Sequence, residues 1–211
     1  MVKQVRAART RQSLIRAAAE VFAADGYALA SLPAISRRAG VSAGALHFHF
    51  ANKEALATEV ESAATDSVEK LAERCRDVAG TSLQSLMRMM SGLLLAVADD
   101  PVIRAGFKLS GDPSRKSDAA ILAWWHDCVR DLVLQAQRAG ELADDVSPDE
   151  ATTAIVAATV GIEVIAAMDD GWPPAERLAQ FWSFILPRLA AFPESALMAM
   201  AEETQPQGSI Q

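Results

Sequence analysis

Several signatures of enzymes, metal sites and secreted proteins are missing from this sequence of 211 residues. Its two cysteines, Cys75 and Cys128, lie far apart and form no C-x-x-C pair. We therefore expect reduced thiols rather than a disulfide. Of its three histidines, His47 and His49 are two residues apart and would diverge on a helix, which leaves only His126 elsewhere. No metal site is expected.

Long uncharged apolar runs are also scarce. Charged residues interrupt each apolar stretch, as at Leu93 to Val97, which Asp99 soon follows, and the N-terminus has no apolar signal-peptide core. These absences predict a soluble cytoplasmic protein that does not bind a membrane. The chain has no G-x-S-x-G motif, no glycine loop for phosphate and no carboxylate and histidine set at motif spacing. We predict that it is not an enzyme and needs no cofactor.

The apolar residues that are present recur at helical intervals. Hydrophobic residues make up 51% of the chain, which is enough to build a substantial core in one or two domains. We find no strand-like alternation and no internal repeat, so the predicted fold class is all-α. Beyond residue 52, helices are expected over 53–78, 83–98, 101–110, 117–139 and 148–168, with a last helix ending near 191.

The most informative stretch is SLPAISRRAGVSAGALHFHFANKEAL, residues 31–56. Its first part predicts a short helix, since Leu32, Ile35 and Ala39 recur at intervals of three and four residues. Ser31 is placed to cap that helix, with a proline tolerated in its first turn. Gly40 suits the left-handed conformation that ends a helix.

A second short helix follows, with Ser42 as its cap. Leu46 and Phe50 are four residues apart and are expected to point inward. The outward residues are then Ala43, Gly44, Ala45, His47, Phe48 and His49. A major groove admits one helix, and small residues at its leading end let the backbone approach base edges. The two helices therefore predict a helix-turn-helix that reads DNA.

The charge distribution supports this interpretation. Residues 1–50 hold seven basic and two acidic residues, whereas the remainder holds 13 basic and 25 acidic residues, for a net charge of −7. A basic N-terminal part on an acidic chain is expected where one end faces phosphates.

These segments resemble the N-terminal domain of the tetracycline-repressor (TetR) family. The resemblance is carried by Arg9 and Arg11 leading into LIRAAAEVFAADGY, and then by AGVSAGALHFHFANKEAL. It implies an all-helical homodimer with three small DNA-binding helices and a larger helical domain for an effector and for dimerisation. It also implies a phosphate contact from Lys53 at the start of the next helix. With these positions, the expected DNA-binding residues are Arg9, Arg11, Ser31, Arg37, Arg38, Ser42, Ala43, Gly44, Ala45, His47, Phe48, His49 and Lys53.

Two positions depart from the family pattern. Ala43 stands where the family often has lysine, and His47 stands where it usually has a phosphate-binding tyrosine. Both changes remove common contacts with the DNA backbone, so lower affinity is expected. Histidine changes charge near neutral pH, so we also expect operator affinity to depend on pH through His47. Most of the phosphate attraction is then expected from the flanking basic residues Arg9, Arg11, Arg37, Arg38 and Lys53.

The last two expected helices are candidates for dimerisation, because in the family the corresponding helices of two subunits form a four-helix interface. The first offers small residues, namely Ala154, Ala157, Ala158, Gly161 and Val164; the second offers Leu178, Phe181, Trp182, Ile185 and Leu189. Two subunits would space two recognition helices for palindromic half-sites on double-stranded DNA. The alternative is that all these residues fill the core of one subunit. Glu163 either pairs across this interface or faces the effector pocket.

A narrower resemblance is to the γ-butyrolactone receptors of actinomycetes. It is carried by DPVIRAGFKLS, which begins at Asp100, and by AWWHDCVRDLVLQAQRAGEL. It implies a repressor that a small lipophilic autoregulator releases from DNA, with Trp125 as the best match for a tryptophan that contacts the effector. The expected ligand-binding residues are Met89, Met90, Leu93, Phe107, Trp125, Cys128, Val129 and Val160. Replacing Trp125 with alanine is expected to preserve operator binding and abolish release.

Alternatives remain open for both effector and function. Some relatives use a glutamine in the long connecting helix, where this chain has Ala64. The missing donor leaves an antibiotic or biosynthetic intermediate as an alternative effector. The residues named for the effector are more typical of a hydrophobic core than of a ligand pocket. A helical scaffold protein that binds no DNA is a further alternative. The expected division is DNA binding in 1–52, effector binding and dimerisation in 53–192, and a disordered tail in 193–211.

Overall fold

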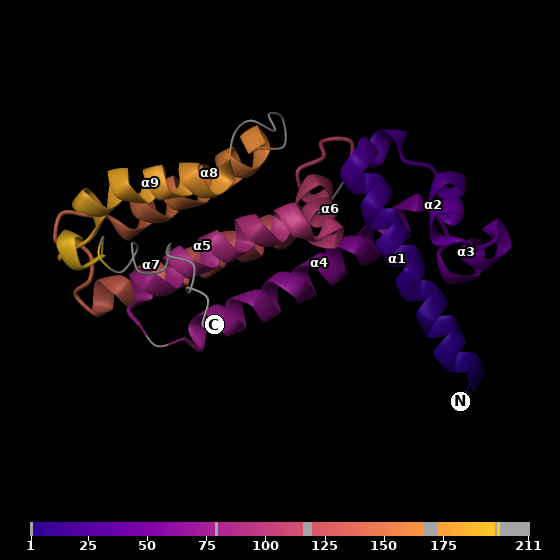
Figure 1. The fold of residues 1–211 in the computed structure, drawn as a ribbon, viewed down its shortest axis with the longest axis horizontal. Helices are drawn as coiled ribbons and strands as arrows, with labels where there is room; N and C mark the ends of the chain where they lie inside the picture. The colour runs from indigo at the N-terminus through magenta and orange to yellow at the C-terminus, as the bar shows by residue number, and fades with distance from the viewer. Residues whose placement is uncertain (1, 79, 116–119, 167–172, 197, 199–211) are drawn as a thin grey trace, which may run out of the picture. The chain divides into compact units, whose positions relative to one another are not determined.

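The described residues of the computed structural model are helical nearly throughout. The model describes residues 2–78, 80–115, 120–166, 173–196 and 198, with the side chains of residues 2 and 3 left out. The helices in these ranges are α1 (Val2–Leu29), α2 (Leu32–Ala39), α3 (Ala43–His49), α4 (Lys53–Arg76), α5 (Ser82–Asp99), α6 (Pro101–Ser110), α7 (Ala120–Arg138), α8 (Pro148–Ala166) and α9 (Pro174–Leu189), as labelled in Figure 1. The same ranges hold no strand beyond one isolated bridge between Leu142 and Ala190. The predicted all-α class is confirmed.

The predicted helix bounds are close to the observed ones. The helix 101–110 is as expected, whereas α4 ends at Arg76 instead of 78 and α9 at Leu189 instead of 191. The start of the helix expected from 117, over residues 117–119, and the expected helix end at 168 lie outside the described residues.

The chain packs as two compact units. One unit contains residues 1–70 and 96–124, and the other contains 71–95 and 125–211. Helices α4, α5 and α7 each pass from one unit to the other. The boundary between these units differs from the one expected at residue 52, because residues 53–70 and 96–124, which include α6, pack with the N-terminal helices. The expected functional division at that boundary stays a prediction.

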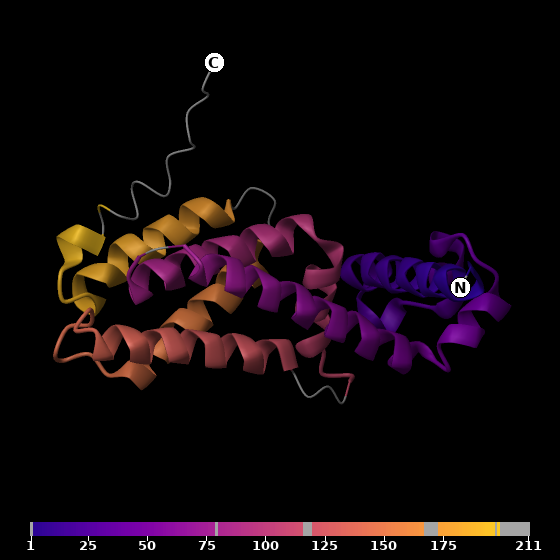
Figure 2. The same cartoon turned by 90° about the horizontal axis from the view of Figure 1, so that it is seen from below.

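The first unit is built around α1. Helices α2 and α6 both pack against α1, and α1, α2 and α3 gather at the indigo end of the chain in Figures 1 and 2. The core includes Leu14, Phe22, Ile35, Leu46 and Leu56, each exposed by 1% or less. Helix α1 is interrupted at Gly26, whose φ of 75° lies in the left-handed region that glycine tolerates. This interruption sets the direction of the chain into α2.

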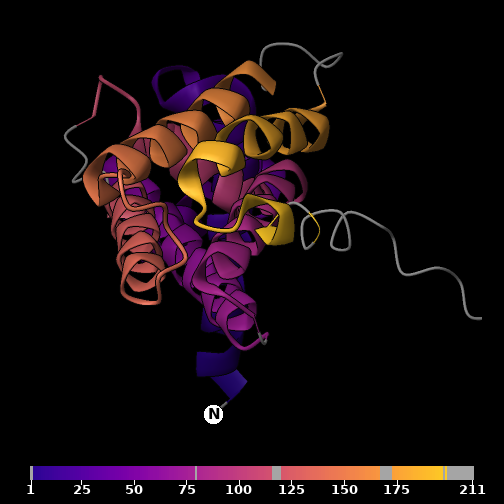
Figure 3. The same cartoon turned by 90° about the vertical axis from the view of Figure 1, so that its left-hand side faces the viewer.

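In the second unit, α8 and α9 pack side by side (Figures 1 and 3). The segment after α7 pairs with the end of α9, since the Ala143 N–H donates to the Leu189 carbonyl at 3.0 Å and the Ala191 N–H donates to the Glu141 carbonyl at 2.8 Å. The Glu141 carboxylate accepts hydrogen bonds from the Ser82 and Leu83 N–H groups at 3.1 and 2.9 Å. Glu141 therefore satisfies free donors at the start of α5.

The expected disordered tail, residues 193–211, stays a prediction, although its first residues are helical. Residues 193–196 are helical, and the Ala196 N–H donates to the Phe192 carbonyl at 3.2 Å. Residues 199–211 of that predicted tail lie outside the described residues.

Candidate DNA-binding site and effector region

The helix-turn-helix has the local geometry that its residues predict. The Ser31 hydroxyl accepts from the Ala34 N–H at 3.3 Å, and Gly40 ends α2 with a φ of 67°. The Ser42 hydroxyl accepts from the Ala45 N–H at 3.2 Å and caps α3. Both serines thus stabilise helix starts through their side chains. The contacts with DNA expected of Ser31 and Ser42 stay predictions.

Ser36 also stabilises the turn, and its role is not evident from the sequence pattern. It is buried, its hydroxyl donates to the Val41 carbonyl at 2.6 Å, and its own carbonyl accepts from the Val41 N–H at 3.1 Å. These bonds join the last turn of α2 to the residue before the cap of α3. The signal that could have revealed this role is the position of Ser36, a small hydroxyl residue on the apolar side of a short helix.

Helix α3 divides into a buried and an exposed face. Leu46 and Phe50 are 1% and 3% exposed, as expected of residues that hold the helix in place. Ala43, Gly44 and His47 are exposed, Ala45 and His49 are half-buried, and Phe48 is 81% exposed with its ring in edge contact with that of His49. A phenylalanine ring this exposed leaves its apolar surface in contact with water, and a partner that covered the ring would remove that contact. The exposed face is therefore suited to a partner surface.

The basic residues expected to attract phosphate have different surroundings. Arg11 pairs with Glu59 and lies over the Phe50 ring at 5.4 Å, and Arg38 pairs with Glu20 at 2.5 Å. Both side chains remain substantially exposed. Arg9 and Arg37 are exposed and form no ion pair within the described part of the chain. Arg9 and Arg37 thus have the charges most available to DNA.

Lys53 is engaged inside the protein. Its Nζ donates to the carbonyls of Tyr27 and Ala30 at 2.7 and 3.0 Å, and lies 4.3 Å from the centre of the Tyr27 ring. The Tyr27 carbonyl lies in the last turn of α1 and the Ala30 carbonyl directly follows that helix, where carbonyls have no partner within the helix. Lys53 therefore holds the start of α4 to the segment that precedes the helix-turn-helix. Its expected phosphate contact would compete with these bonds.

A charge cluster around the buried Arg115 in the same unit was not anticipated from the sequence. We call Tyr27, Glu54, Glu61 and Arg115 the Arg115 cluster. Arg115 Nη2 donates to Glu54 and Glu61 at 2.8 Å each, and the Tyr27 hydroxyl donates to Glu54 at 2.6 Å. Hydrogen bonds from Arg115 and Tyr27 lower the pKa of Glu54. Burial and the neighbouring Glu54 carboxylate raise the pKa of Tyr27 to about 12.

The DPV-R-AG segment is explained by the packing of α6. Asp100 caps the helix by accepting from the Val102 N–H at 2.8 Å, and Pro101 occupies its first turn. The Arg104 side chain donates to the carbonyls of Val97 and Ala98 at the end of α5. Gly106 meets Ala64 so closely that a methyl group there would overlap the Ala64 side chain. Each of these residues therefore has a structural role.

The residues expected to bind an effector are mostly core residues. Phe107 is half-buried in the first unit, and the other seven belong to the second unit. Within it, Met89, Met90, Leu93, Trp125, Cys128 and Val129 are buried, and Val160 is half-buried. The Arg76 guanidinium lies 3.5 Å from the Cys128 sulfur, and burial raises the pKa of that thiol. Their role in ligand binding stays a prediction.

The burial of Trp125 changes the experiment proposed for it. Its side chain is fully buried, so truncation to alanine would leave a large cavity. Such truncations typically cost about 3–5 kcal/mol of folding stability. The expectation that Trp125→Ala preserves operator binding is therefore not a fair test of ligand contact, and Trp125→Phe is the better variant.

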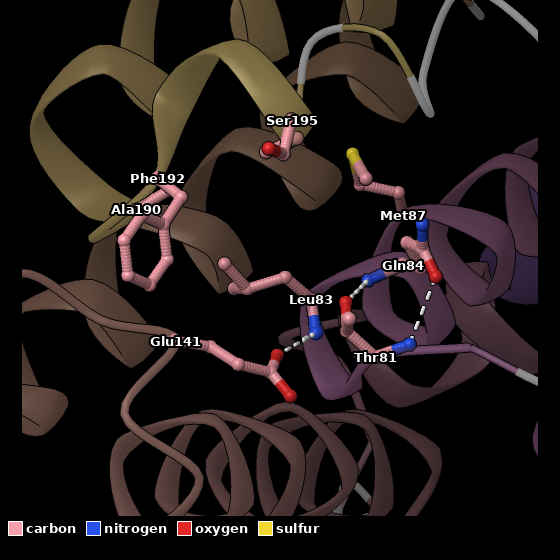
Figure 4. A pocket seen from close by; sticks show the side chains of 9 residues that line it. Thr81, Leu83, Gln84, Met87, Glu141, Ala190, Phe192 and Ser195 are labelled. Carbon is pink, nitrogen blue, oxygen red and sulfur yellow. Dashed lines mark hydrogen bonds between the residues drawn. The ribbon is translucent and has the colours of Figure 1, made fainter.

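A hollow of about 160 Å³ lies elsewhere in the second unit (Figure 4). It is lined by Thr81, Leu83, Gln84, Met87, Glu141, Ala190, Phe192, Ser195 and Ala196. In Figure 4, Leu83, Met87 and Phe192 border the hollow, and Glu141 bonds to the Leu83 N–H. None of the eight expected ligand residues lines it. The side chains of Thr81, Gln84 and Glu141 bond to backbone groups at the start of α5, and the hollow lies apart from the eight expected residues.

The apolar surface of α8 and α9 differs in part from expectation. On α8, Ala154, Ala157 and Val164 are exposed, and no side chain fills the space beside Gly161. On α9, however, Leu178, Trp182 and Leu189 are 4% exposed or less, so they belong to the subunit core. Phe181 and Ile185 are half-buried, and Phe184, which the sequence did not single out, is 82% exposed. The expected face of α9 was wrong for the three buried residues, because their side chains pack within the subunit core.

Comparison with known families decides the identity of the fold. Residues 14–60 match the model of the tetR family of bacterial regulatory proteins, and residues 80–191 match the tetracyclin repressor-like C-terminal domain. The second match alone covers more than half of the chain. The protein belongs to the TetR family. The resemblance inferred from the sequence is confirmed, and the TetR match includes the whole helix-turn-helix described above.

Similar proteins narrow the position within the TetR family. The A-factor receptor protein of Streptomyces griseus is 34% identical over 90% of this chain and 67% of its own length. A crystal structure of a gamma-butyrolactone receptor, an ArpA-like protein, matches with a TM-score of 0.78 and 28% identity over 94% of this chain and 97% of that one. CprB of Streptomyces coelicolor matches with a TM-score of 0.80 and 29% identity over 94% of this chain and all of that one. CprB is also known in complex with its operator sequence.

Across the described residues, no three or more His, Cys, Asp or Glu side chains gather in an arrangement that would hold a metal ion. No helix within those residues is both long and apolar enough to span a bilayer.

Proposed function

We propose that this TetR-family protein is a repressor that binds operator DNA through α3 and is released by a small lipophilic effector of the γ-butyrolactone type. The observation that carries the DNA-binding part is the exposed face of α3. Phe48 is 81% exposed on a helix that Leu46 and Phe50 fix from behind. Small residues lead that helix, which suits close approach to base edges in a major groove. The proposed site of action is the cytoplasm, where operator DNA lies, and we propose no enzymatic activity.

The surrounding charges support the same role. Arg9 and Arg37 are exposed and unpaired with any carboxylate of the described chain, whereas Arg11 and Arg38 are already ion-paired. Phosphate contacts position a protein on DNA without reading sequence. We therefore expect Arg9 and Arg37 to contribute more to affinity than Arg11 and Arg38.

A binding assay with DNA from upstream of the chain's own gene tests this proposal. Labelled duplexes tiling that region are titrated at two salt concentrations, with an unrelated duplex as competitor. Specific binding that weakens with salt supports the repressor. Arg37→Ala is expected to reduce the slope of log affinity against log salt by about one, because one phosphate contact is lost. No specific duplex at either salt concentration would favour the scaffold alternative.

The effector proposal comes from the receptors to which the chain is similar and from the apolar residues of the second unit. A synthetic γ-butyrolactone added to the operator complex is expected to release the DNA. Trp125→Phe keeps the core filled but removes the indole N–H, so it is expected to weaken release while leaving operator affinity unchanged. If Trp125→Phe releases the DNA at the same ligand concentrations as the wild-type chain, Trp125 is not the effector contact.

One observation favours a different effector class as the second candidate. Ala64 is fully buried and packs directly on Gly106, so α4 presents no polar donor at this position. An antibiotic or biosynthetic intermediate that needs no donor from α4 fits this packing. A competition panel of lactones and apolar antibiotics in the same release assay separates the two classes.

Dimerisation is proposed through α8 and α9. The exposed small residues of α8 allow close approach of a second helix, and Phe184 of α9 supplies a large apolar side chain nearby in the same unit. Helix-turn-helix proteins usually bind as dimers to two half-sites about one helical turn apart. A palindromic operator is therefore expected.

A further inference from the structure

Arg115 has surroundings that are unusual for a charged residue. It lies in the segment after α6, and its side chain is 1% exposed. Its Nη1 donates to the Leu109 carbonyl at 3.2 Å, and its Nη2 donates to Glu54 and Glu61. A buried guanidinium is tolerated only when its partners are held in good geometry. The positions of these partners and of Arg115 are therefore linked.

On α4, Arg115 joins two successive parts of the helix. Glu54 and Glu61 are seven residues apart, so they lie on one face two turns from each other. Each has an oxygen 2.8 Å from the same nitrogen of Arg115. Two carboxylates so close together would repel one another without the guanidinium between them. Arg115 thus links side chains on the first and third turns of α4.

On α1, Arg115 is joined to Tyr27. The guanidinium carbon lies 5.0 Å from the centre of the Tyr27 ring, and the Tyr27 hydroxyl donates to the Glu54 oxygen Oε2 at 2.6 Å. The ring also has the Lys53 ammonium 4.3 Å from its centre. Tyr27 directly follows the interruption of α1 at Gly26, and α2 begins at Leu32. Tyr27 is therefore the large side chain that anchors the chain just before the helix-turn-helix.

We propose that Arg115 is a positioning residue for operator binding. By holding Glu54, Glu61 and Tyr27 together, it fixes the end of α1, and with it the helix-turn-helix, against the first three turns of α4. Base reading requires a recognition helix held to within a fraction of an ångström, which a loose support does not provide. This inference rests on the proposed function. It assigns an influence on DNA affinity, exerted through packing, to a segment distant in sequence from α3.

The test compares Arg115→Met with Arg104→Met in the full chain. Arg104 is a matched control, because it lies in the same unit at the other end of α6 and donates to the backbone carbonyls of Val97 and Ala98 instead. Operator affinity is measured with the upstream duplex, alongside circular dichroism and the thermal midpoint. Arg115→Met is expected to weaken operator binding about tenfold or more, and Arg104→Met by less than about twofold.

The salt dependence distinguishes positioning from direct contact with DNA. A buried Arg115 touches no phosphate, so the slope of log affinity against log salt should be the same for Arg115→Met and the wild-type chain. A slope lower by about one would show a lost phosphate contact and overturn the proposal.

Coupling to Tyr27 distinguishes positioning from a general loss of stability. Arg115→Met and Tyr27→Leu should each weaken operator binding, and the double variant should be little weaker than either, because both remove the same support. Fully additive losses would overturn the proposal. If Arg115→Met does not fold, Arg115→Lys retains the charge and permits the same cycle, with a smaller loss of affinity expected.

Two outcomes of the operator titrations separate the proposed function from this inference. Failure of the wild-type protein to bind any upstream duplex would overturn the proposed function and this inference with it. Equal operator affinity of the wild-type chain and folded Arg115→Met would overturn this inference alone.

Discussion

Ala64 of α4 and Gly106 of α6 are in such close contact that the two helices meet with only a single methyl group between their backbones. Ala64 is fully buried, and Gly106 is buried as well. Small residues at one point of a helix crossing allow the helix backbones to approach closely, as this pair does. The glycine of the DPV-R-AG segment is thus required by packing rather than by backbone conformation.

Replacing Gly106 with alanine is expected to destabilise the protein. Alanine is the better helix former by about 1 kcal/mol, but its methyl group would overlap the Ala64 side chain and force the helices apart. Overpacking of this kind typically costs about 1–3 kcal/mol. Chemical denaturation of Gly106→Ala and the wild-type chain gives the difference in the free energy of unfolding.

The exchanged pair is the control for this prediction. In Gly106→Ala with Ala64→Gly, the methyl group moves from one helix to the other, so most of the lost stability should return. A double variant as unstable as Gly106→Ala would show that the close contact is not the cause. Ala64→Gln, which places a larger polar side chain against Gly106, is expected to destabilise the fold.

The second prediction concerns the titration of Tyr27, which is the chain's single tyrosine. Its pKa is raised from 10.0 to about 12, first by burial and then by its hydrogen bond to Glu54 and the charge of that carboxylate. Ultraviolet absorbance of tyrosinate therefore reports this one residue directly. Glu54→Gln removes the negative charge, so the tyrosine pKa should fall toward its ordinary value.

The raised pKa also determines the direction of a stability change with pH. Between about pH 10 and 12 the unfolded chain loses the tyrosine proton while the folded chain keeps it, so folding takes up a proton. The free energy of unfolding contributed by Tyr27 should then decrease as pH rises through this window. Tyr27→Phe should remove that decrease. An ordinary tyrosine titration near pH 10 in the folded chain would contradict the hydrogen-bonded arrangement.

The third prediction separates the two faces of α3. Leu46→Ala removes a side chain that is 1% exposed and should cost about 2–5 kcal/mol of folding stability. Phe48→Ala removes a side chain that is 81% exposed and should leave the thermal midpoint nearly unchanged. Its operator affinity should nevertheless fall by about tenfold, which corresponds to 1.4 kcal/mol of lost contact. Denaturation and operator titration of the same samples test both halves.

One result would contradict the role given to the exposed face of α3. Unchanged operator affinity in folded Phe48→Ala would show that the exposed ring does not contact DNA. Gln12→Ala, at an exposed position on α1, is a control for effects of surface substitution alone.

Local sequence signals predicted the helix-turn-helix well because its features depend on neighbouring residues. Ser31, Gly40 and Ser42 cap or end helices through bonds within a few residues of themselves. Arg115 and Glu54, in contrast, are 61 positions apart in the chain, and no local pattern announces their pairing. For the same reason the charge count could not show that Arg11 and Arg38 are ion-paired within the first unit.

The face of α9 was mispredicted for a related reason. Helical spacing identifies residues that share a face, but it does not state whether that face meets the same subunit or a second one. Trp182 and Leu189 share a face that is buried within the subunit, whereas Phe184 lies on another. Only the packing of α9 within the folded subunit decides which face is buried there and which is left for a partner. That packing involves residues distant in sequence.

The fourth prediction is that Phe184 contributes strongly to dimerisation. A phenylalanine that is 82% exposed in one subunit gains stability when a partner covers it, and interface anchors of this type commonly contribute about 2 kcal/mol or more. Phe184→Glu places a charge in the same position, so the dimer dissociation constant should rise by about 30-fold or more. Sedimentation velocity over a concentration series measures this shift.

Ser183→Glu is the matched control, because it introduces the same charge at the neighbouring exposed position of α9. A glutamate at 183 projects about 100° away around the helix and should leave the dimer largely intact. Operator affinity should fall in Phe184→Glu alone, since separated subunits bind one half-site each. If both variants sediment as the wild-type chain does, dimerisation uses another surface, and the exposed ring of Phe184 needs a different partner.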